Sequence, residues 1–322
     1  MDKKVLFIGD SRKMKGGVST VMKTLEKSSL WEKYHCGWLE TQFNAGNLLK
    51  ILYLLKGIVK GLFIIPKYDI CHFQTTAGPG MMTLFPIFLY TLLCKNKIVV
   101  QLHMGNQIMG FSDGLMFNFW CKHTDLLLFL GKKWQEELKC KLPTNLKTDF
   151  LYNPVPREDK QDSYEKYFLY AAFFHENKGC DVFMKAFSKV VKKYPEWKVV
   201  MCGAGNTEWV NSLVKDLCLE NNVVLPGWVT GIEKETYFRN AFAYCMTSYQ
   251  EGLPMSVLES LTYGVPVITT PVGCLPEVLE DNKTALFVDF GNSDMLAEKM
   301  ILLIEDSALR EHLATNSFDM AN

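Results

Sequence analysis

Residues 241–270 read AFAYCMTSYQEGLPMSVLESLTYGVPVITT. The segment places two apolar runs, 241–248 and 265–270, on either side of a helix-like stretch that starts near Pro254. A strand, a helix and a second strand in this order form the connecting unit of a parallel sheet. The segment therefore predicts a βαβ unit, with the loop around Glu251 at the carboxyl end of its first strand.

The same alternation of strand-like and helix-like segments runs along the whole chain. In 179–195 and 206–221, for example, apolar residues recur with the three- and four-residue spacing of an amphipathic helix. The predicted strands are 5–9, 70–74, 98–103, 126–130, 167–174, 198–203, 223–225, 241–247 and 265–269. We therefore predict an α/β protein whose parallel sheets are covered by helices.

The size of the chain indicates two domains. At 322 residues and 36.9 kDa it is about twice the commonest domain size. Its 48% apolar and 22% charged residues exclude a disordered chain, a collagen and a small disulfide scaffold. Two prolines and a charge cluster in 153–162 interrupt the pattern. We place two doubly wound, Rossmann-like domains at 1–157 and 158–322, with ligands at the carboxyl ends of their strands.

Charge is balanced overall but unevenly distributed. The 35 basic and 35 acidic residues give no indication of nucleic-acid binding, and we expect no nucleic-acid partner. Residues 1–150 contain 20 basic and 11 acidic residues, whereas residues 151–322 contain 15 and 24. A basic half and an acidic half predict domains with different partners, one of them anionic. The alternative is that the net charges of the two halves diverged without any functional role.

The cysteines and the N-terminus indicate a cytoplasmic protein. The ten cysteines form no CxxC motif or metal-ligand spacing, which predicts free thiols in a reducing compartment. The N-terminal MDKKVLFIGD has no secretory signal, and the low-charge stretch 81–94 is too short to span a bilayer. The inner face of the membrane is an alternative location. We expect no metal, because no DxD-type acidic cluster is found.

Two carboxylates flank the predicted helix start at Pro254. Glu251 lies in the preceding loop and Glu259 about one turn into the helix. A helix N-terminus offers free N–H groups and a positive dipole end, which suit a diphosphate. Carboxylates can accept hydrogen bonds from the vicinal hydroxyls of sugars. The spacing suits a nucleotide-sugar, and a capping Glu beside a solvated one is the alternative interpretation.

Residues 251–289 closely resemble the donor-site signature of retaining family 4 glycosyltransferases of the GT-B fold. Further matches follow in the order of the family. They are KGGV at 15–18, the His-x-Gly element at His103, DLLLFLGKKWQEEL at 125–138, YNPVP at 152–156, NKG at 177–179, VVMCGAG at 199–205 and VVLPGWV at 223–229. The resemblance thus covers most of the chain.

The resemblance implies a role for each matching residue. Glu259 would bind the ribose hydroxyls and Glu251 the transferred sugar, while Lys178 would neutralise the diphosphate. His103 would contact the transferred sugar from the N-terminal domain. The remaining nucleotide-sugar contacts would come from Gly16, Gly17, Gly203, Gly205, Trp228, Val229, Gly252, Leu253, Pro254, Met255, Ser256, Val257 and Leu258.

The sequence departs from the family pattern in three places. Phe173 stands where the family usually has an Arg, which would remove a contact worth ~1.5–3 kcal/mol unless another residue replaces it. His175, Lys15 and Lys13 are the candidate replacements. Cys274 stands where a second Gly is common. Family members usually continue through one more helix that crosses back to the N-terminal domain, and we expect it to be missing here.

The implied function is retaining transfer of a sugar from a nucleoside diphosphate, UDP- or GDP-linked, to a glycan or lipid-linked acceptor. Polysaccharide synthesis at the cell surface is the expected context, and no cofactor is expected. One alternative is a GT-B nucleotide-sugar epimerase; a phosphorylase would need a cofactor-lysine motif that is not found. A degenerate, non-catalytic binding subunit is the other alternative, supported by Phe173.

The segment 47–65 (NLLKILYLLKGIVKGLFII) is strongly apolar and contains Lys50, Lys56 and Lys60. As a helix it could lie on an anionic membrane surface. An ordinary domain helix whose lysines extend to solvent is an equal alternative. Membrane contact would suit an acceptor carried on a lipid.

Overall fold

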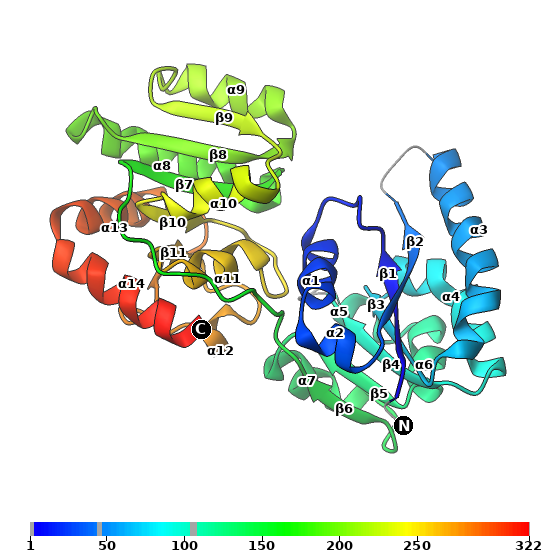
Figure 1. Ribbon diagram of the computed structural model, residues 1–322. Helices are drawn as coiled ribbons and strands as arrows, with labels where there is room; N and C mark the ends of the chain where they lie inside the picture. Colours follow the sequence, from blue (N-terminus) through cyan, green and yellow to red (C-terminus); the bar gives the residue numbers. More distant parts are fainter. Residues whose placement is uncertain (1–2, 44–46, 104–107, 322) are drawn as a thin grey trace. The chain divides into compact units, whose positions relative to one another are not determined.

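A computed structural model describes residues 3–43, 47–103 and 108–321 and divides the chain into two compact units, Met1–Pro154 and Val155–Asn322. This division lies three residues before the predicted boundary at 157/158, within the same connecting segment. Each unit has its own sheet with helices packed around it (Figure 1).

The N-terminal unit is a six-stranded sheet in the order β2-β1-β3-β4-β5-β6, in which all pairs are parallel. Its strands are β1 (Val5–Asp10), β2 (Gly37–Gln42), β3 (Ile70–Thr75), β4 (Lys97–Leu102), β5 (Leu126–Phe129) and β6 (Lys147–Phe150). Its helices are α1 (Gly17–Glu26), α2 (Ser29–Lys33), α3 (Asn47–Ile64), α4 (Pro79–Leu93), α5 (Ile108–Phe111), α6 (Leu115–Lys122) and α7 (Lys132–Leu138), with short 3₁₀ turns at Ile65–Lys67 and Lys139–Lys141.

The C-terminal unit is a second six-stranded parallel sheet, in the order β12-β11-β10-β7-β8-β9. Its strands are β7 (Tyr167–Phe174), β8 (Lys198–Gly205), β9 (Val223–Gly227), β10 (Ala243–Met246), β11 (Val267–Thr269) and β12 (Leu286–Phe287). Its helices are α8 (Cys180–Lys193), α9 (Thr207–Asp216), α10 (Gly231–Arg239), α11 (Met255–Thr262), α12 (Leu275–Val278), α13 (Ser293–Glu305) and α14 (Ser307–Ala321), with a 3₁₀ turn at Glu176–Lys178.

The predicted fold class is confirmed: both units are α/β, and helices cover their parallel sheets. The strands β2, β6 and β12 are not among the predicted ones. All three lie at sheet edges. Polar residues interrupt the apolar run in β2 and β6, and β12 is only two residues long. The strands predicted at 241–247 and 265–269 are shorter, Ala243–Met246 and Val267–Thr269, because the flanking residues of these apolar runs lie outside the regular strand.

Aromatic side chains form much of the buried core in each unit. In the N-terminal unit Trp120 stacks on Phe88 with ring centres 3.9 Å apart, and Phe73 meets Trp120 edge to face. In the C-terminal unit Phe242 meets Trp197 edge to face at 4.5 Å. Contacts of this kind fix each sheet against its helices.

Helix α3 packs against the sheet through glycines. A Cβ atom at Gly57 would lie 3.0 Å from the carbonyl oxygen of Glu40 on β2, and one at Gly61 would lie 3.3 Å from Leu39. Tyr53 fixes the rotation of the helix, since its hydroxyl donates to Glu40 at 2.7 Å. Burial favours the protonated form of Glu40, but hydrogen bonds from Ser11, Tyr53 and Arg12 lower its pKa to about 2. Glu40 is therefore ionised, and its carboxylate holds Tyr53 of α3 through a hydrogen bond.

All ten cysteines are free, as predicted. Six are buried, whereas Cys140 and Cys218 are exposed. Across the described parts of the chain, no helix combines the length and the apolar character that crossing a bilayer requires.

Two substitutions test the packing of α3. Gly57→Leu should destabilise the protein by about 1–3 kcal/mol, because the new side chain has no space beside the β2 backbone. Leu55→Ala on the half-exposed opposite side should change the free energy of unfolding by less than about 1 kcal/mol. Urea unfolding of both variants measures the difference, and equal losses would contradict this orientation of the helix.

Candidate functional site

The candidate site lies where the strand order of the C-terminal sheet reverses. β7 has β8 on one side and β10 on the other, so the connections that leave β7 and β10 run to opposite sides. Ligands of doubly wound sheets bind at this point, outside the carboxyl ends of the strands. The two loops meet here: the Tyr249 amide after β10 donates to the Asn177 carbonyl after β7 at 2.9 Å.

Lys178 and Glu251 form an ion pair across this junction, with Nζ 2.6 Å from Oε1. Both side chains remain partly open to solvent, at 27% and 18% exposure. Two hydroxyl groups fix the Lys178 carbonyl. The buried Tyr170 hydroxyl donates to it at 2.6 Å and the Thr247 hydroxyl at 3.1 Å. Both charged residues stand in motifs that predict a site, but nothing in the sequence indicates their direct contact.

Gly179 allows this turn to approach β10 closely. Its φ is +68°, and a Cβ atom would lie 2.4 Å from the Thr247 carbonyl oxygen. Any other residue would push the Lys178 turn away from β10. In the Lys178-Gly179 dipeptide, the glycine therefore provides the backbone conformation that positions the lysine side chain.

Helix α11 begins at Met255, next to the ion pair, and no described side chain caps its N-terminus. The N-terminal turn is held by buried Tyr244, whose hydroxyl donates to Ser256 Oγ at 2.7 Å. Burial raises the pKa of Tyr244, so this hydroxyl stays protonated. A positive helix end with unfilled N–H groups is a suitable site for an anion.

Gly273 packs closely against the backbone of the loop before α11. Its φ is +61°, and a Cβ atom would lie 2.1 Å from the Gly252 carbonyl oxygen. That carbonyl accepts a hydrogen bond from the Cys274 amide at 2.9 Å. Cys274, which departs from the family pattern, is itself buried and its backbone still makes this contact.

Glu259 pairs with Lys234 on α10, with Nζ 2.6 Å from Oε2. The Glu259 side chain is only 13% exposed and Lys234 31%. The sequence analysis missed Lys234, because α10 matches no motif and its 25-residue separation from Glu259 gives no local signal. The two acidic candidates are thus each paired with a lysine.

Phe173 is 54% exposed at the carboxyl end of β7. Its ring lies against Gly205, where a Cβ atom would be 3.0 Å from the phenyl ring and 2.6 Å from the Phe174 carbonyl. A Cβ atom at Gly203 would lie 2.1 Å from the Ala172 carbonyl. The close approach of β8 to β7 therefore accounts for these two glycines, which the sequence analysis assigned to space for a nucleotide.

Of the remaining predicted residues of this unit, residues 255–258 form the first turn of α11, and the others lie in the loops that precede α10 and α11. Four have largely buried side chains, so they can offer a ligand little more than their backbone: Val229, Met255, Val257 and Leu258. Leu253 and Pro254 are buried as well, whereas Trp228 and Gly252 are partly exposed.

Gly16, Gly17 and His103 belong to the N-terminal unit. Gly16 precedes α1 with a φ of +151°, and no atom lies within 4 Å of a Cβ built on it. Gly17 is the first residue of α1, which no described side chain caps. The N-terminus of α1 is thus another open helix end.

His103 follows β4 and belongs to a chain of hydrogen-bonding side chains. Its Nε2 contacts the amide oxygen of buried Gln74, whose nitrogen donates to Gln101 at 3.0 Å and lies 3.1 Å from His72 Nε2. Burial lowers the pKa of His103 to about 4. Burial, together with the neighbouring His103, lowers the pKa of His72 to about 3. His103 is therefore a neutral, oriented imidazole; residues 104–107 of its motif lie outside the described residues.

The two partly buried histidines should make stability depend on pH. Unfolded His72 binds a proton as the pH falls below its ordinary pKa of 6.5, whereas the folded protein keeps it neutral down to about 3. The free energy of unfolding should therefore fall as the pH decreases from 6.5, by at most about 1.4 kcal/mol per pH unit for this group. Urea unfolding at neutral and mildly acidic pH should show a smaller loss for His72→Gln than for the wild type. An equal loss would contradict a neutral His72 in the folded protein.

Residues 155–320, about half of the chain, match the family model "Glycosyl transferases group 1". The chain belongs to the glycosyl transferases group 1 family. The matched range contains both ion pairs, the α11 N-terminus and Phe173. The candidate site therefore lies within the part of the chain that defines the family.

Among the relatives of this family member, an uncharacterized glycosyltransferase of Haemophilus influenzae is 24% identical over 188 residues, which cover 57% of the chain and 52% of the relative. The poly(glycerol-phosphate) alpha-glucosyltransferase of Bacillus subtilis is 31% identical over 140 residues, covering 43% and 20%. The matched segments thus span about half or less of these two relatives.

The whole fold is similar to a solved GT-B glycosyltransferase structure. The crystal structure of Anabaena HepE in complex with UDP and glucose superposes with a TM-score of 0.78 at 17% identity, covering 99% of this chain and 94% of HepE. The architecture of this family member is therefore GT-B: two Rossmann-like units.

Proposed function

We propose that this protein is a retaining glycosyltransferase that uses a nucleoside-diphosphate sugar as its donor. The observation that supports this proposal best is the uncapped N-terminus of α11, with Lys178, Glu251 and Glu259 around it. A helix end and a lysine suit a diphosphate, and the two carboxylates suit two hydroxyl-bearing rings. The UDP-bound state of HepE, which has the same fold, supports a uridine nucleotide as the first donor to test.

In this proposal Lys178 is the cation that receives the diphosphate. The Lys178 ammonium has three donors, so it can contact phosphate while it still holds Glu251. The free protein already keeps the lysine ordered, which lowers the entropy lost on binding. Lys234 is a second lysine of this unit that is paired with a proposed site residue, since it contacts Glu259.

The proposed roles of the carboxylates differ. Glu259, in α11, would accept hydrogen bonds from the ribose, while Glu251, before the helix, would accept them from the transferred sugar. The leaving diphosphate would be stabilised by Lys178 and the α11 N–H groups, without a metal. We propose that the acceptor attacks from the face on which the diphosphate leaves, with a phosphate oxygen as the base, so that the anomeric configuration is retained.

The N-terminal unit would provide the acceptor side. Gly16 and Gly17 would add N–H groups for the phosphates, and neutral His103 would contact the transferred sugar. The proposed acceptor is a glycan or a lipid-linked glycan of a cell-surface polysaccharide. The excess of 20 basic over 11 acidic residues in 1–150 supports an anionic acceptor, and the Bacillus subtilis relative is named for poly(glycerol-phosphate).

A donor panel tests the transferase proposal directly. Release of nucleoside diphosphate from UDP- and GDP-sugars should rise when glycan acceptors are added, and should persist when EDTA is present. Lys178→Ala should reduce turnover at least about a hundredfold and weaken nucleotide binding, because the diphosphate loses its cation. Lys215→Ala, an exposed lysine on α9, is the matched control.

Three outcomes would overturn parts of this proposal. Conversion of the donor sugar without any acceptor would indicate an epimerase. Nucleotide binding without turnover on every donor and acceptor would indicate a binding subunit. An unchanged nucleotide affinity in Lys178→Ala would remove the diphosphate from this position.

Substitution of the two carboxylates should affect the affinity for free nucleoside diphosphate differently. Glu259→Ala should weaken binding of free nucleoside diphosphate about tenfold, because hydrogen bonds to a charged group are lost. Glu251→Ala should bind it as well as the wild type or more tightly, since Lys178 is released, but should turn over slowly. Calorimetry with both variants, and with Glu298→Ala on α13 as control, measures this difference. Equal losses of affinity would contradict the assigned division.

A further inference from the structure

Helix α3 exposes an unusually apolar outer surface, which we call the α3 face. Eight large apolar side chains of this helix are between 43% and 71% exposed. They are Leu48, Leu49, Ile51, Leu52, Leu55, Val59, Leu62 and Phe63. Contiguous apolar areas of this size on a folded protein usually mark an interaction surface.

The orientation of α3 is the reverse of that of an ordinary amphipathic helix. Gly57 and Gly61 face the sheet, where added Cβ atoms would nearly touch Glu40 and Leu39. Leu52, Leu55 and Val59 lie on the opposite side, with the spacing of one helical stripe. The glycines, with the partly buried Tyr53, Leu54 and Ile58, make the packing contact, and eight other large apolar residues stay outside. Burial in this unit therefore does not account for the exposed ones.

The α3 face continues onto the neighbouring helix. Tyr90 of α4 donates its hydroxyl to the Leu62 carbonyl at 3.0 Å, which joins the two helices. α4 exposes Met82, Leu89 and Leu93, the last at 78%. In Figure 1 both helices lie on the side of the N-terminal sheet opposite α1 and α2.

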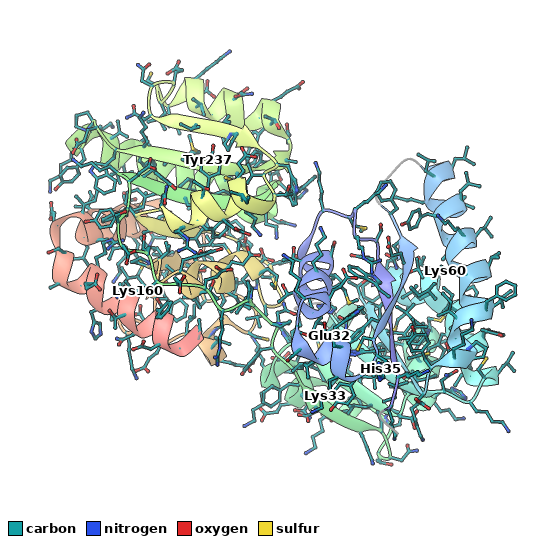
Figure 2. All side chains as sticks on the ribbon, in the orientation of Figure 1. Glu32, Lys33, His35, Lys60, Lys160 and Tyr237 are labelled. Carbon is teal, nitrogen blue, oxygen red and sulfur yellow. The ribbon has the colours of Figure 1, made fainter. Side chains whose placement is uncertain are left out.

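The charge on α3 has one sign. The helix contains Lys50, Lys56 and Lys60, all exposed, and no acidic residue. Figure 2 shows Lys60 on this outer helix. By helical spacing Lys56 and Lys60 flank the apolar stripe, whereas Lys50 lies on the glycine side in the first turn of the helix. Lysines beside an apolar stripe can keep their ammonium groups at the level of lipid headgroups while their stems follow the apolar surface.

We propose that the α3 face docks the protein on the surface of an anionic lipid bilayer. The apolar stripe would enter the boundary between headgroups and acyl chains, and the lysines would meet anionic headgroups. A second copy of the chain fits less well, because a symmetric contact through α3 would gather the lysines of both copies at one interface, and neither α3 offers an acidic partner. The proposal does not rest on the transferase activity, although docking would place the N-terminal unit next to lipid-linked acceptors.

Vesicle co-sedimentation tests the proposal. The wild type should bind vesicles of phosphatidylcholine with ~30% phosphatidylglycerol at about 50 mM NaCl, and should bind less at about 500 mM. Lys50→Gln, Lys56→Gln and Lys60→Gln together should lower binding at least about tenfold. The control triple variant replaces Lys192, Lys198 and Lys215 of the C-terminal unit, which are also exposed, and should bind like the wild type.

A second variant tests the contribution of the apolar residues of the α3 face. Leu55→Gln with Val59→Gln should abolish binding at both salt concentrations, while circular dichroism and nucleotide affinity stay unchanged. The unchanged nucleotide affinity separates this result from any failure of the donor site. Absence of wild-type binding at low salt, or equal losses in the two lysine variants, would overturn the proposal. So would a stable dimer in solution that the Leu55→Gln, Val59→Gln variant disrupts.

Discussion

The reversal of strand order between β7 and β10 is the constraint on which the candidate site depends. It brings together two loops that are 73 residues apart, and the 2.6 Å contact between Lys178 and Glu251 forms across them. The position of this ion pair depends on the backbone of the Lys178 turn. Tyr170 and Thr247 fix the Lys178 carbonyl, and Gly179 brings the turn against β10. Buried hydroxyls and a left-handed glycine thus hold a partly exposed charge in position, which is how a preorganised site avoids losing entropy when its ligand binds.

Two further arrangements follow from the same principle of close backbone approach. Gly273 supports the loop before α11, and Gly203 and Gly205 allow β8 to lie close to β7, so that Phe173 is turned outward at the sheet edge. Another element contributes a lysine to this region, because Lys234 on α10 pairs with Glu259. In the N-terminal unit, glycines have a different effect. Gly57 and Gly61 bring α3 close to β2 and leave its leucines outside.

Much of the fold could be predicted from the sequence, for reasons that are local. Buried parallel strands such as β7 and β8 are continuous apolar runs, and helices such as α8 repeat apolar residues every three or four positions, so each is visible in its own segment. The strands β2, β6 and β12 were missed, because β2 and β6 contain polar residues and β12 is only two residues long. Of the site, Lys178, Glu251 and Glu259 could be selected because each stands in a recognisable motif.

The sequence by itself determined the α/β class, the two units and the acidic and basic residues of the motifs, because these depend on short-range spacing. Only the tertiary structure decided what those residues touch. Nothing local relates Lys234 to Glu259, or Gln74 to His103, since such contacts arise when the sheet brings distant strand ends and loops together. The direction of α3 was likewise undecided in the sequence, where leucines and glycines both recur at helical spacing. The sheet selected the glycine side, because only the smallest residues allow the helix to approach the β2 backbone so closely.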